Sequence, residues 1–165
     1  MPKLVIGYGN PSRNDDGVGL AVVNHLRQRL GLSSLDGDDS GFSDLGRDLD
    51  TLFLQQLTPE LAETLAAYDS VFFVDAHVAT FPEMVRRTPI REGMAPAMVS
   101  HHVRPEGLLA LARLLYGRAP AAELLSIRGS DFDFGTCLSP ATAAAAQDVA
   151  DELWASAGAH GVRDS

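Results

Sequence analysis

The sequence has little of what several common classes of protein require. It contains one cysteine, which excludes an internal disulfide and favours a reducing compartment. Lysine and arginine number 13 against 22 acidic residues, and the net charge of −9 argues against a general nucleic-acid or anionic-membrane surface. No apolar run approaches membrane-spanning length, and the N-terminus lacks the charged-then-apolar pattern of a signal peptide. These absences predict a cytoplasmic protein that binds neither nucleic acid nor membranes.

Two hydrolase signatures are also missing. The sequence has no His-Glu-x-x-His pattern, which argues against a zinc peptidase, and no Gly-x-Ser-x-Gly elbow, which argues against a serine hydrolase. The length of 165 residues suits one domain, and the hydrophobic content of 45% is ordinary for a globular protein with a substantial core. We therefore expect residues 1–165 to form a single domain.

Predicted strands and helices alternate along most of the chain. Short apolar runs predict strands over residues 4–6, 52–55, 70–75 and 124–128, with weaker candidates at 84–87 and 97–99. Amphipathic segments with capping residues predict helices over residues 15–30, 59–67, 105–117 and 140–154. The run at 70–75 is apolar on both faces and is expected in the middle of the sheet. The pattern indicates an α/β fold: a three-layer sandwich with a twisted, mostly parallel sheet of about five strands and helices on both faces.

Two segments carry little periodicity. Residues 33–50 are rich in Gly, Ser and Asp, and they predict a solvated acidic loop. A calcium loop is disfavoured there, because Arg47 stands where an EF-hand needs its last glutamate. Residues 156–165 predict a flexible tail. We expect the acidic loop to influence the choice of partner.

The stretch 3–19 is the most distinctive part of the chain. Gly7 and Gly9 follow the first predicted strand and allow a sharp turn with close backbone approach. Ser12 replaces the third glycine of a dinucleotide-binding turn, and Asp15 and Asp16 bring negative charge to the next helix start. Helix N-termini favour anions, and carboxylates there repel phosphate. A nucleotide-binding flavodoxin-like module is therefore disfavoured.

Three polar side chains are expected at the carboxyl ends of the strands, where ligands collect in such folds. They are Asp16, Asp75 and His102. Two carboxylates and one imidazole suit a borderline transition metal and leave coordination positions open. His77 is a reserve ligand. Asp15 is interpreted as a helix-terminal carboxylate favoured by the helix dipole, with a direct site role as the alternative.

The opening motif and three later stretches resemble one family. Gly-x-Gly-Asn after the first strand, followed by Asp-Asp-Gly-x-Gly, is similar to the [NiFe]-hydrogenase maturation endopeptidases, and the resemblance covers residues 3–154 apart from the acidic loop. The later stretches are residues 56–62, 100–109 and 132–140. The matching residues of the opening motif are Gly7, Gly9, Asn10, Asp15, Asp16, Gly17 and Gly19.

The resemblance implies a peptidase that removes a C-terminal extension from the precursor of a [NiFe]-hydrogenase large subunit after nickel insertion. It assigns metal binding to Asp16, Asp75 and His102, with Asp16 standing where other members carry glutamate. The nickel is carried by the substrate, and a metal held by the protein itself is left open. The activity is aspartic-type-like, and we expect the protein to act as a monomer. Either a carboxylate activates water or the metal polarises the scissile carbonyl.

Two alternatives differ in chemistry. A nickel-dependent checkpoint or chaperone would use the same three ligands to bind the immature large subunit without cutting it. A cysteine peptidase would use Cys137 with His102 and Asp75, although a lone cysteine is more often a small buried hydrophobe.

Overall fold

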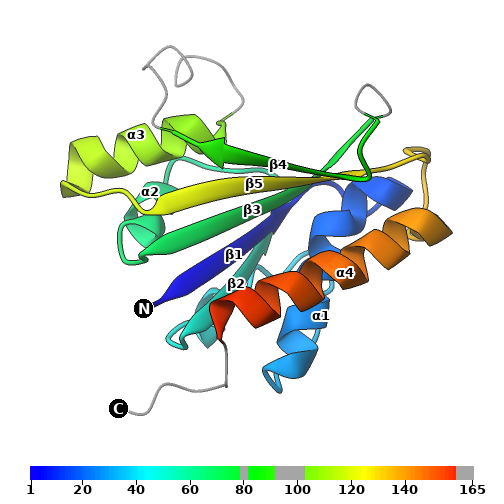
Figure 1. The fold of residues 1–165 in the computed structure, drawn as a ribbon, viewed down its shortest axis with the longest axis horizontal. Coiled ribbons are helices and arrows are strands. Elements are labelled where there is room, and N and C mark those ends of the chain that lie inside the picture. The colour runs from blue at the N-terminus through cyan, green and yellow to red at the C-terminus, as the bar shows by residue number, and fades with distance from the viewer. Residues whose placement is uncertain (79–81, 92–102, 159–165) are drawn as a thin grey trace.

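The structure, a computed structural model, describes residues 1–78, 82–91 and 103–158. Within them the chain forms a five-stranded sheet of order β2-β1-β3-β5-β4, with helices on both faces (Figure 1). The strands are β1 (Lys3–Tyr8), β2 (Leu49–Leu54), β3 (Ser70–His77), β4 (Val85–Ile90) and β5 (Ala121–Arg128). The 3-10 turns are η1 (Asn14–Gly17) and η2 (Phe42–Asp44). The α-helices are α1 (Val18–Arg29), α2 (Leu61–Leu65), α3 (Pro105–Tyr116) and α4 (Pro140–Ala157). The predicted α/β sandwich is confirmed.

The sheet is parallel except at one edge. β1 pairs with β2 and β3, and β3 pairs with β5, all in parallel, whereas β4 is antiparallel to β5. β3 lies in the middle, as its apolar run predicted. The strand expected at 84–87 is present as β4, and the one expected at 97–99 lies outside the described residues. The parallel strands bring the ends of β1, β3 and β5 to a common edge.

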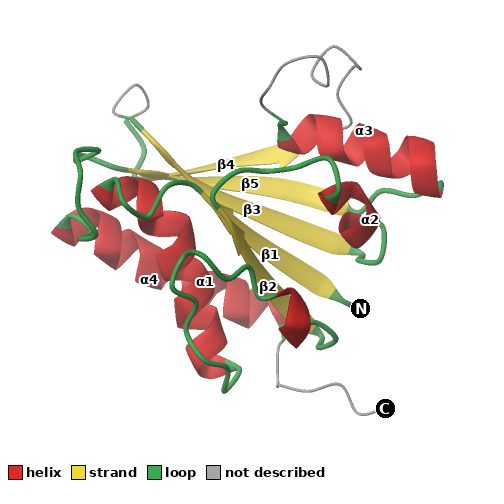
Figure 2. Ribbon diagram, turned by 180° about the vertical axis from the view of Figure 1, so that it is seen from behind, coloured by secondary structure: helices red, strands yellow, loops and turns green. Residues whose placement is uncertain are grey.

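Each face of the sheet has its own apolar core. α1 and α4 cover one face, and α2 and α3 cover the other (Figure 2). Val22 and Leu26 of α1 and Val149 of α4 are at most 1% exposed. Leu61 of α2 and Leu108 of α3 are equally buried on the opposite face. Each fully buried side chain of this size stabilises the fold by about 1.5–3 kcal/mol. Leu115, near the end of α3, is 59% exposed, whereas Leu108 and Leu109 earlier in the helix pack into the core.

Three glycines allow β1 to touch the start of α1. A Cβ on Gly7 would lie 2.3 Å from the carbonyl oxygen of Gly19, and a Cβ on Gly19 would lie 2.8 Å from the carbonyl oxygen of Val74. Gly9 has a φ of +140°, and its Cβ would lie 2.3 Å from the carbonyl oxygen of Asp16. Real Cβ contacts do not come this close to backbone atoms, so these positions exclude side chains. The approach brings Asp16 against the end of β1.

The helix expected from residue 15 begins later. Residues 14–17 form the 3-10 turn η1, and α1 starts at Val18. Asn14 has a φ of +44°, a left-handed conformation that a regular helix does not accept. Asp15 and Asp16 therefore lie on a tight 3-10 turn. The prediction that they occupy the first turn of the helix is wrong. At the other end of the chain, α4 runs to Ala157, past the expected start of the tail, and residues 159–165 lie outside the described residues.

β3 also extends beyond its predicted end. Asp75 was expected to terminate the strand, but the pairing with β5 continues from Asp75 opposite Ser126 to His77 opposite Arg128. Strand pairing continues because β5 offers partners for both residues, and the His77 ring bonds the Ser126 hydroxyl. Asp75 therefore sits inside the sheet, with firm backbone support.

The acidic segment 33–50 is more ordered than expected. Arg27 of α1 is 2% exposed and donates to the Ser33 carbonyl oxygen at 2.6 Å and the Asp44 carboxylate at 2.7 Å. Leu49 and Asp50 belong to β2, and Asp50 accepts from the Tyr68 hydroxyl at 2.6 Å. A charged residue is tolerated inside the strand because its carboxylate is hydrogen-bonded. The predicted loop is therefore two residues too long, because residues 49 and 50 belong to β2, and the buried Arg27 side chain holds part of the loop against α1.

Candidate active site

Asp16 lies where η1 meets the end of β1. Its Oδ2 accepts a hydrogen bond from the Asn10 backbone N–H at 2.9 Å. Asn10 in turn accepts from the Ser12 N–H at 2.9 Å, which makes residues 10–16 a compact, self-bonded turn. The Asp16 side chain is partly exposed. Because only Oδ2 of Asp16 accepts this hydrogen bond and the side chain is partly exposed, its other oxygen, Oδ1, can bind a ligand.

Asp75 presents one satisfied and one unsatisfied oxygen. Its Oδ2 accepts a hydrogen bond from the Tyr8 hydroxyl at 2.9 Å. Its Oδ1 is buried and has no hydrogen-bond partner among the described residues. Burial raises the pKa of Asp75, and the charge of Asp16 adds to the increase, while the Ser126 and Tyr8 hydroxyls and His77 oppose it. An orphaned buried carboxylate oxygen is costly, and such groups mark functional sites.

Tyr8 is a site residue that the sequence analysis missed. Burial raises the pKa of Tyr8, and the charges of Asp75 and Glu106 raise it further, so the hydroxyl stays protonated and acts as a donor. The sequence places Tyr8 at the end of a strand, but it does not show the partner of its hydroxyl. The parallel register pairs Gly7 with Val74 and so brings Tyr8 beside Asp75. Tyr8 fixes which oxygen of Asp75 remains available.

His77, the reserve ligand, is engaged on both sides of its ring. Nδ1 lies 3.0 Å from the Ser126 hydroxyl, and Nε2 lies 3.1 Å from the Glu83 carbonyl oxygen. A carbonyl only accepts, so Nε2 is the donor in its contact with Glu83. With both nitrogens used within the fold, His77 serves to hold β3, β5 and the start of β4 together. This geometry argues against the reserve role.

Asp15 holds two distant loops together. It is fully buried and accepts from the N–H groups of Ser130, Asp131 and Ser139 at 2.8, 2.9 and 2.7 Å. The Ser139 hydroxyl donates to it as well, at 2.7 Å. Burial raises the pKa of Asp15, but the hydrogen bonds from Ser139, Ser130 and Asp131 outweigh it and leave the pKa below its ordinary value. Asp15 is therefore a loop latch, and neither the dipole interpretation nor a direct site role describes it.

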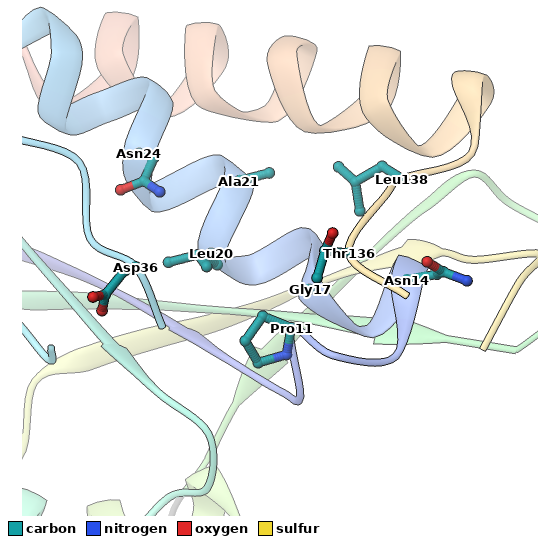
Figure 3. A pocket seen from close by; sticks show the side chains of 9 residues that line it. All are labelled: Pro11, Asn14, Gly17, Leu20, Ala21, Asn24, Asp36, Thr136 and Leu138. Atoms are coloured by element: carbon teal, nitrogen blue, oxygen red, sulfur yellow. The ribbon is translucent and has the colours of Figure 1, made fainter. Parts of the chain in front are cut away.

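Asn14 strengthens the same junction. Its N–H donates to the Gly135 carbonyl oxygen at 2.8 Å, and its Oδ1 accepts from the Cys137 N–H at 3.1 Å. Figure 3 shows this junction beside a pocket of about 240 Å³, where Thr136 and Leu138 lie near α1. The amides at this pocket are used within the fold, because Asn24 also bonds the backbone of residue 35 through both its donor and its acceptor. The pocket is thus part of the support for Asp16.

The other predicted site residues are His102 and Cys137. His102 lies outside the described residues, so its expected place beside the carboxylates stays a prediction. Among the residues that are described, no three Asp, Glu, His or Cys side chains gather to hold a metal. Cys137 is exposed, and its thiol makes no hydrogen bond to a described residue. No observation favours the cysteine-peptidase alternative.

The fold of this chain is similar to that of several solved structures. No family model and no curated protein matches the sequence. HybD, a hydrogenase maturating endopeptidase from E. coli, superimposes with a TM-score of 0.68 at 20% identity over 94% of this chain and 91% of its own. HycI, a [NiFe] hydrogenase maturation protease from Thermococcus kodakarensis, superimposes with a TM-score of 0.61 at 18% identity, over 92% of this chain and 89% of its own.

A third structure agrees. The hydrogenase 2 maturation peptidase from a Thaumarchaeota archaeon gives a TM-score of 0.62 at 24% identity, over 96% of this chain and 99% of its own. The class defined here is the α/β sandwich of the hydrogenase maturation endopeptidases. At these identities the likeness establishes the fold, and the expected resemblance is confirmed at that level. None of the helices in the described part of the chain combines the length and hydrophobicity needed to span a bilayer.

Proposed function

We propose that this protein is an endopeptidase that removes the C-terminal extension of a [NiFe]-hydrogenase large-subunit precursor after nickel insertion. The fold shared with three such enzymes over nearly the whole chain supports the class of activity. The observation that carries the site is the Asp75 carboxylate, whose buried Oδ1 has no partner in the described residues. An anionic oxygen kept without a donor suits a cation brought by the substrate.

In this proposal the substrate nickel is met by Asp75 Oδ1, the free oxygen of Asp16 and His102. Oxygen and imidazole donors suit nickel, and three ligands leave positions for the substrate. The scissile peptide bond then lies beside the carboxylates. Water attacks the carbonyl carbon, the C–N bond breaks, and the proton lost by water passes to the leaving amine. Asp75 is suited to act as the base, because burial raises its pKa.

The test is intact mass spectrometry of the nickel-loaded precursor from the same genome, incubated with the protein. We expect loss of a short C-terminal peptide with the wild type and a loss of rate of at least about 100-fold with Asp16→Asn, which keeps the shape but not the charge. Nickel-free precursor is the control and should stay intact. A stable complex with no change in mass would instead support the checkpoint alternative, and absence of any binding would contradict both.

The Tyr8 hydroxyl gives a second, smaller effect. Tyr8→Phe leaves Asp75 Oδ2 without its donor, so the carboxylate loses its fixed orientation. We expect the cleavage rate at saturating precursor to fall about 10-fold, because a misplaced group costs rate more than affinity. Tyr116→Phe is the matched control, since Tyr116 ends α3 and is 48% exposed. An unchanged rate in Tyr8→Phe would remove Tyr8 from the site.

A further inference from the structure

The segment that follows β5 displays an aromatic side chain to solvent. Phe134 is 94% exposed, more than any other large hydrophobic side chain among the described residues. Phenylalanine ordinarily buries about 150–250 Å² in a core or an interface. A single exposed apolar residue needs no explanation by itself. What distinguishes Phe134 is how it is held.

The frame around Phe134 is rigidly bonded. The Asp15 carboxylate accepts hydrogen bonds from the N–H groups of Asp131 and Ser139, which lie before and after Phe134 in the chain. The Gly135 N–H donates to the Ser12 carbonyl oxygen at 3.0 Å, and a Cβ on Gly135 would lie 2.2 Å from Asn14 Oδ1. Phe134 therefore projects from a fixed support. Binding through such a side chain loses little further conformational entropy.

The surface beside Phe134 has the composition of an interface. A hollow of about 560 Å³ is lined by Arg13, Phe132, Asp133 and Phe134. Arg13 is held there, since its Nε donates to the Phe132 carbonyl oxygen at 3.2 Å. Aromatic and arginine anchors with a charged rim are enriched at the energetic centres of protein interfaces.

The same surface is continuous with the candidate active site. The Asp16 N–H donates to the Arg13 carbonyl oxygen at 3.1 Å, so one turn carries both the hollow and the carboxylate. A partner seated on Phe134 is therefore placed at a set position relative to Asp16. A preformed support lowers the entropic cost of binding, and its place on the turn of Asp16 points to the molecule that is processed there.

We infer that Phe134, with Phe132 and Arg13, docks the folded body of the precursor through an apolar recess near its C-terminal extension. This inference rests on the proposed function, because that function supplies the partner. Docking and cutting are then separate tasks. Phe134 contributes affinity, and Asp16 and Asp75 contribute chemistry.

The test compares Phe134→Ser, Phe134→Leu and Leu114→Ser with the wild type. Leu114 is the matched control, an exposed apolar side chain on α3 (77%) that lies toward the opposite edge of the sheet. Affinity for the nickel-loaded precursor is measured by biolayer interferometry, and cleavage by mass spectrometry at limiting and saturating precursor. We expect Phe134→Ser to weaken binding at least 10-fold and raise KM in proportion with kcat unchanged. Phe134→Leu should retain part of the affinity, and Leu114→Ser should match the wild type.

The outcomes separate the two claims. Cleavage and affinity both unchanged in Phe134→Ser would overturn the docking surface and leave the proposed function standing. Binding that depends on Phe134, with no cleavage by the wild type, would support the docking surface and overturn the peptidase activity. A loss of self-association in Phe134→Ser with unchanged precursor affinity would assign the surface to a second copy and overturn the inference. The thermal unfolding of Phe134→Ser should match that of the wild type, since the ring is exposed.

Discussion

Replacing Asp75 with asparagine is expected to abolish processing of the precursor while making the free protein more stable. The amide keeps the shape and can still accept from Tyr8, but it brings no negative oxygen to nickel and no base to water. We expect cleavage to fall at least about 1,000-fold. We also expect the free energy of unfolding at pH 7 to rise by about 0.5–2 kcal/mol, because the orphaned charge is removed.

The pH dependence checks the cause of that gain. The pKa of Asp75 is raised in the folded state, so its charge destabilises the fold above the ordinary aspartate pKa, and the penalty disappears as the pH falls below it. The variant should therefore exceed the wild type in Tm at pH 7 and approach it near pH 4, in thermal unfolding followed by circular dichroism without nickel. Asp148→Asn, an exposed carboxylate on α4, is the control. A Tm for Asp75→Asn below that of the wild type at pH 7 would contradict the interpretation that Asp75 Oδ1 carries an unpaired charge.

Asp15→Asn is expected to have the opposite effect, with a large loss of stability. Oδ2 of Asp15 accepts from Ser130, Asp131 and the Ser139 hydroxyl, while Oδ1 accepts from the Ser139 N–H. Whichever way the amide turns, its NH₂ group faces a backbone N–H. We expect the free energy of unfolding at pH 7 to fall by roughly 2–4 kcal/mol, since buried donors lose a charged acceptor.

The sign of the pH effect is also reversed. The pKa of Asp15 is lowered in the folded state, so its contribution is complete above the ordinary aspartate pKa and is lost as the pH falls through the folded value. The difference in the free energy of unfolding between Asp15→Asn and the wild type, measured by urea unfolding, should therefore narrow below about pH 4. Asp16→Asn is the natural comparison, because the adjacent carboxylate accepts one backbone N–H and should lose activity with little loss of stability. Equal stability of Asp15→Asn and the wild type at pH 7 would exclude the latch.

The alternation of apolar runs and helical patterns predicted the sheet and the layers because those signals are local. β3 was placed in the middle from its own composition, and α3 was bounded by Pro105 and by Gly117, whose φ is +77°. Asp16 and Asp75 were predicted as site residues because each was expected to follow or end a strand near the carboxyl edge of the sheet.

The roles of Asp15 and Tyr8 could not be predicted in the same way. The partners of Asp15 lie 115–124 positions further along the chain, and no local pattern announces them. Tyr8 and Asp75 are 67 positions apart, and their contact depends on the register between β1 and β3. Side chains that act through distant partners are visible only once the strands are paired.

The latch between residues 15 and 139 also has a consequence for synthesis. Both carboxylates of the site belong to the first half of the chain, but the strand and loop that support them lie in the last third of it. A nascent chain that has left the ribosome only as far as α3 already carries Asp16 and Asp75. It lacks β5, which pairs beside Asp75, and it lacks the later residues that donate hydrogen bonds to Asp15. Contacts of such long sequence separation form late in folding. The candidate site is therefore expected to be complete only after most of the chain has been synthesised.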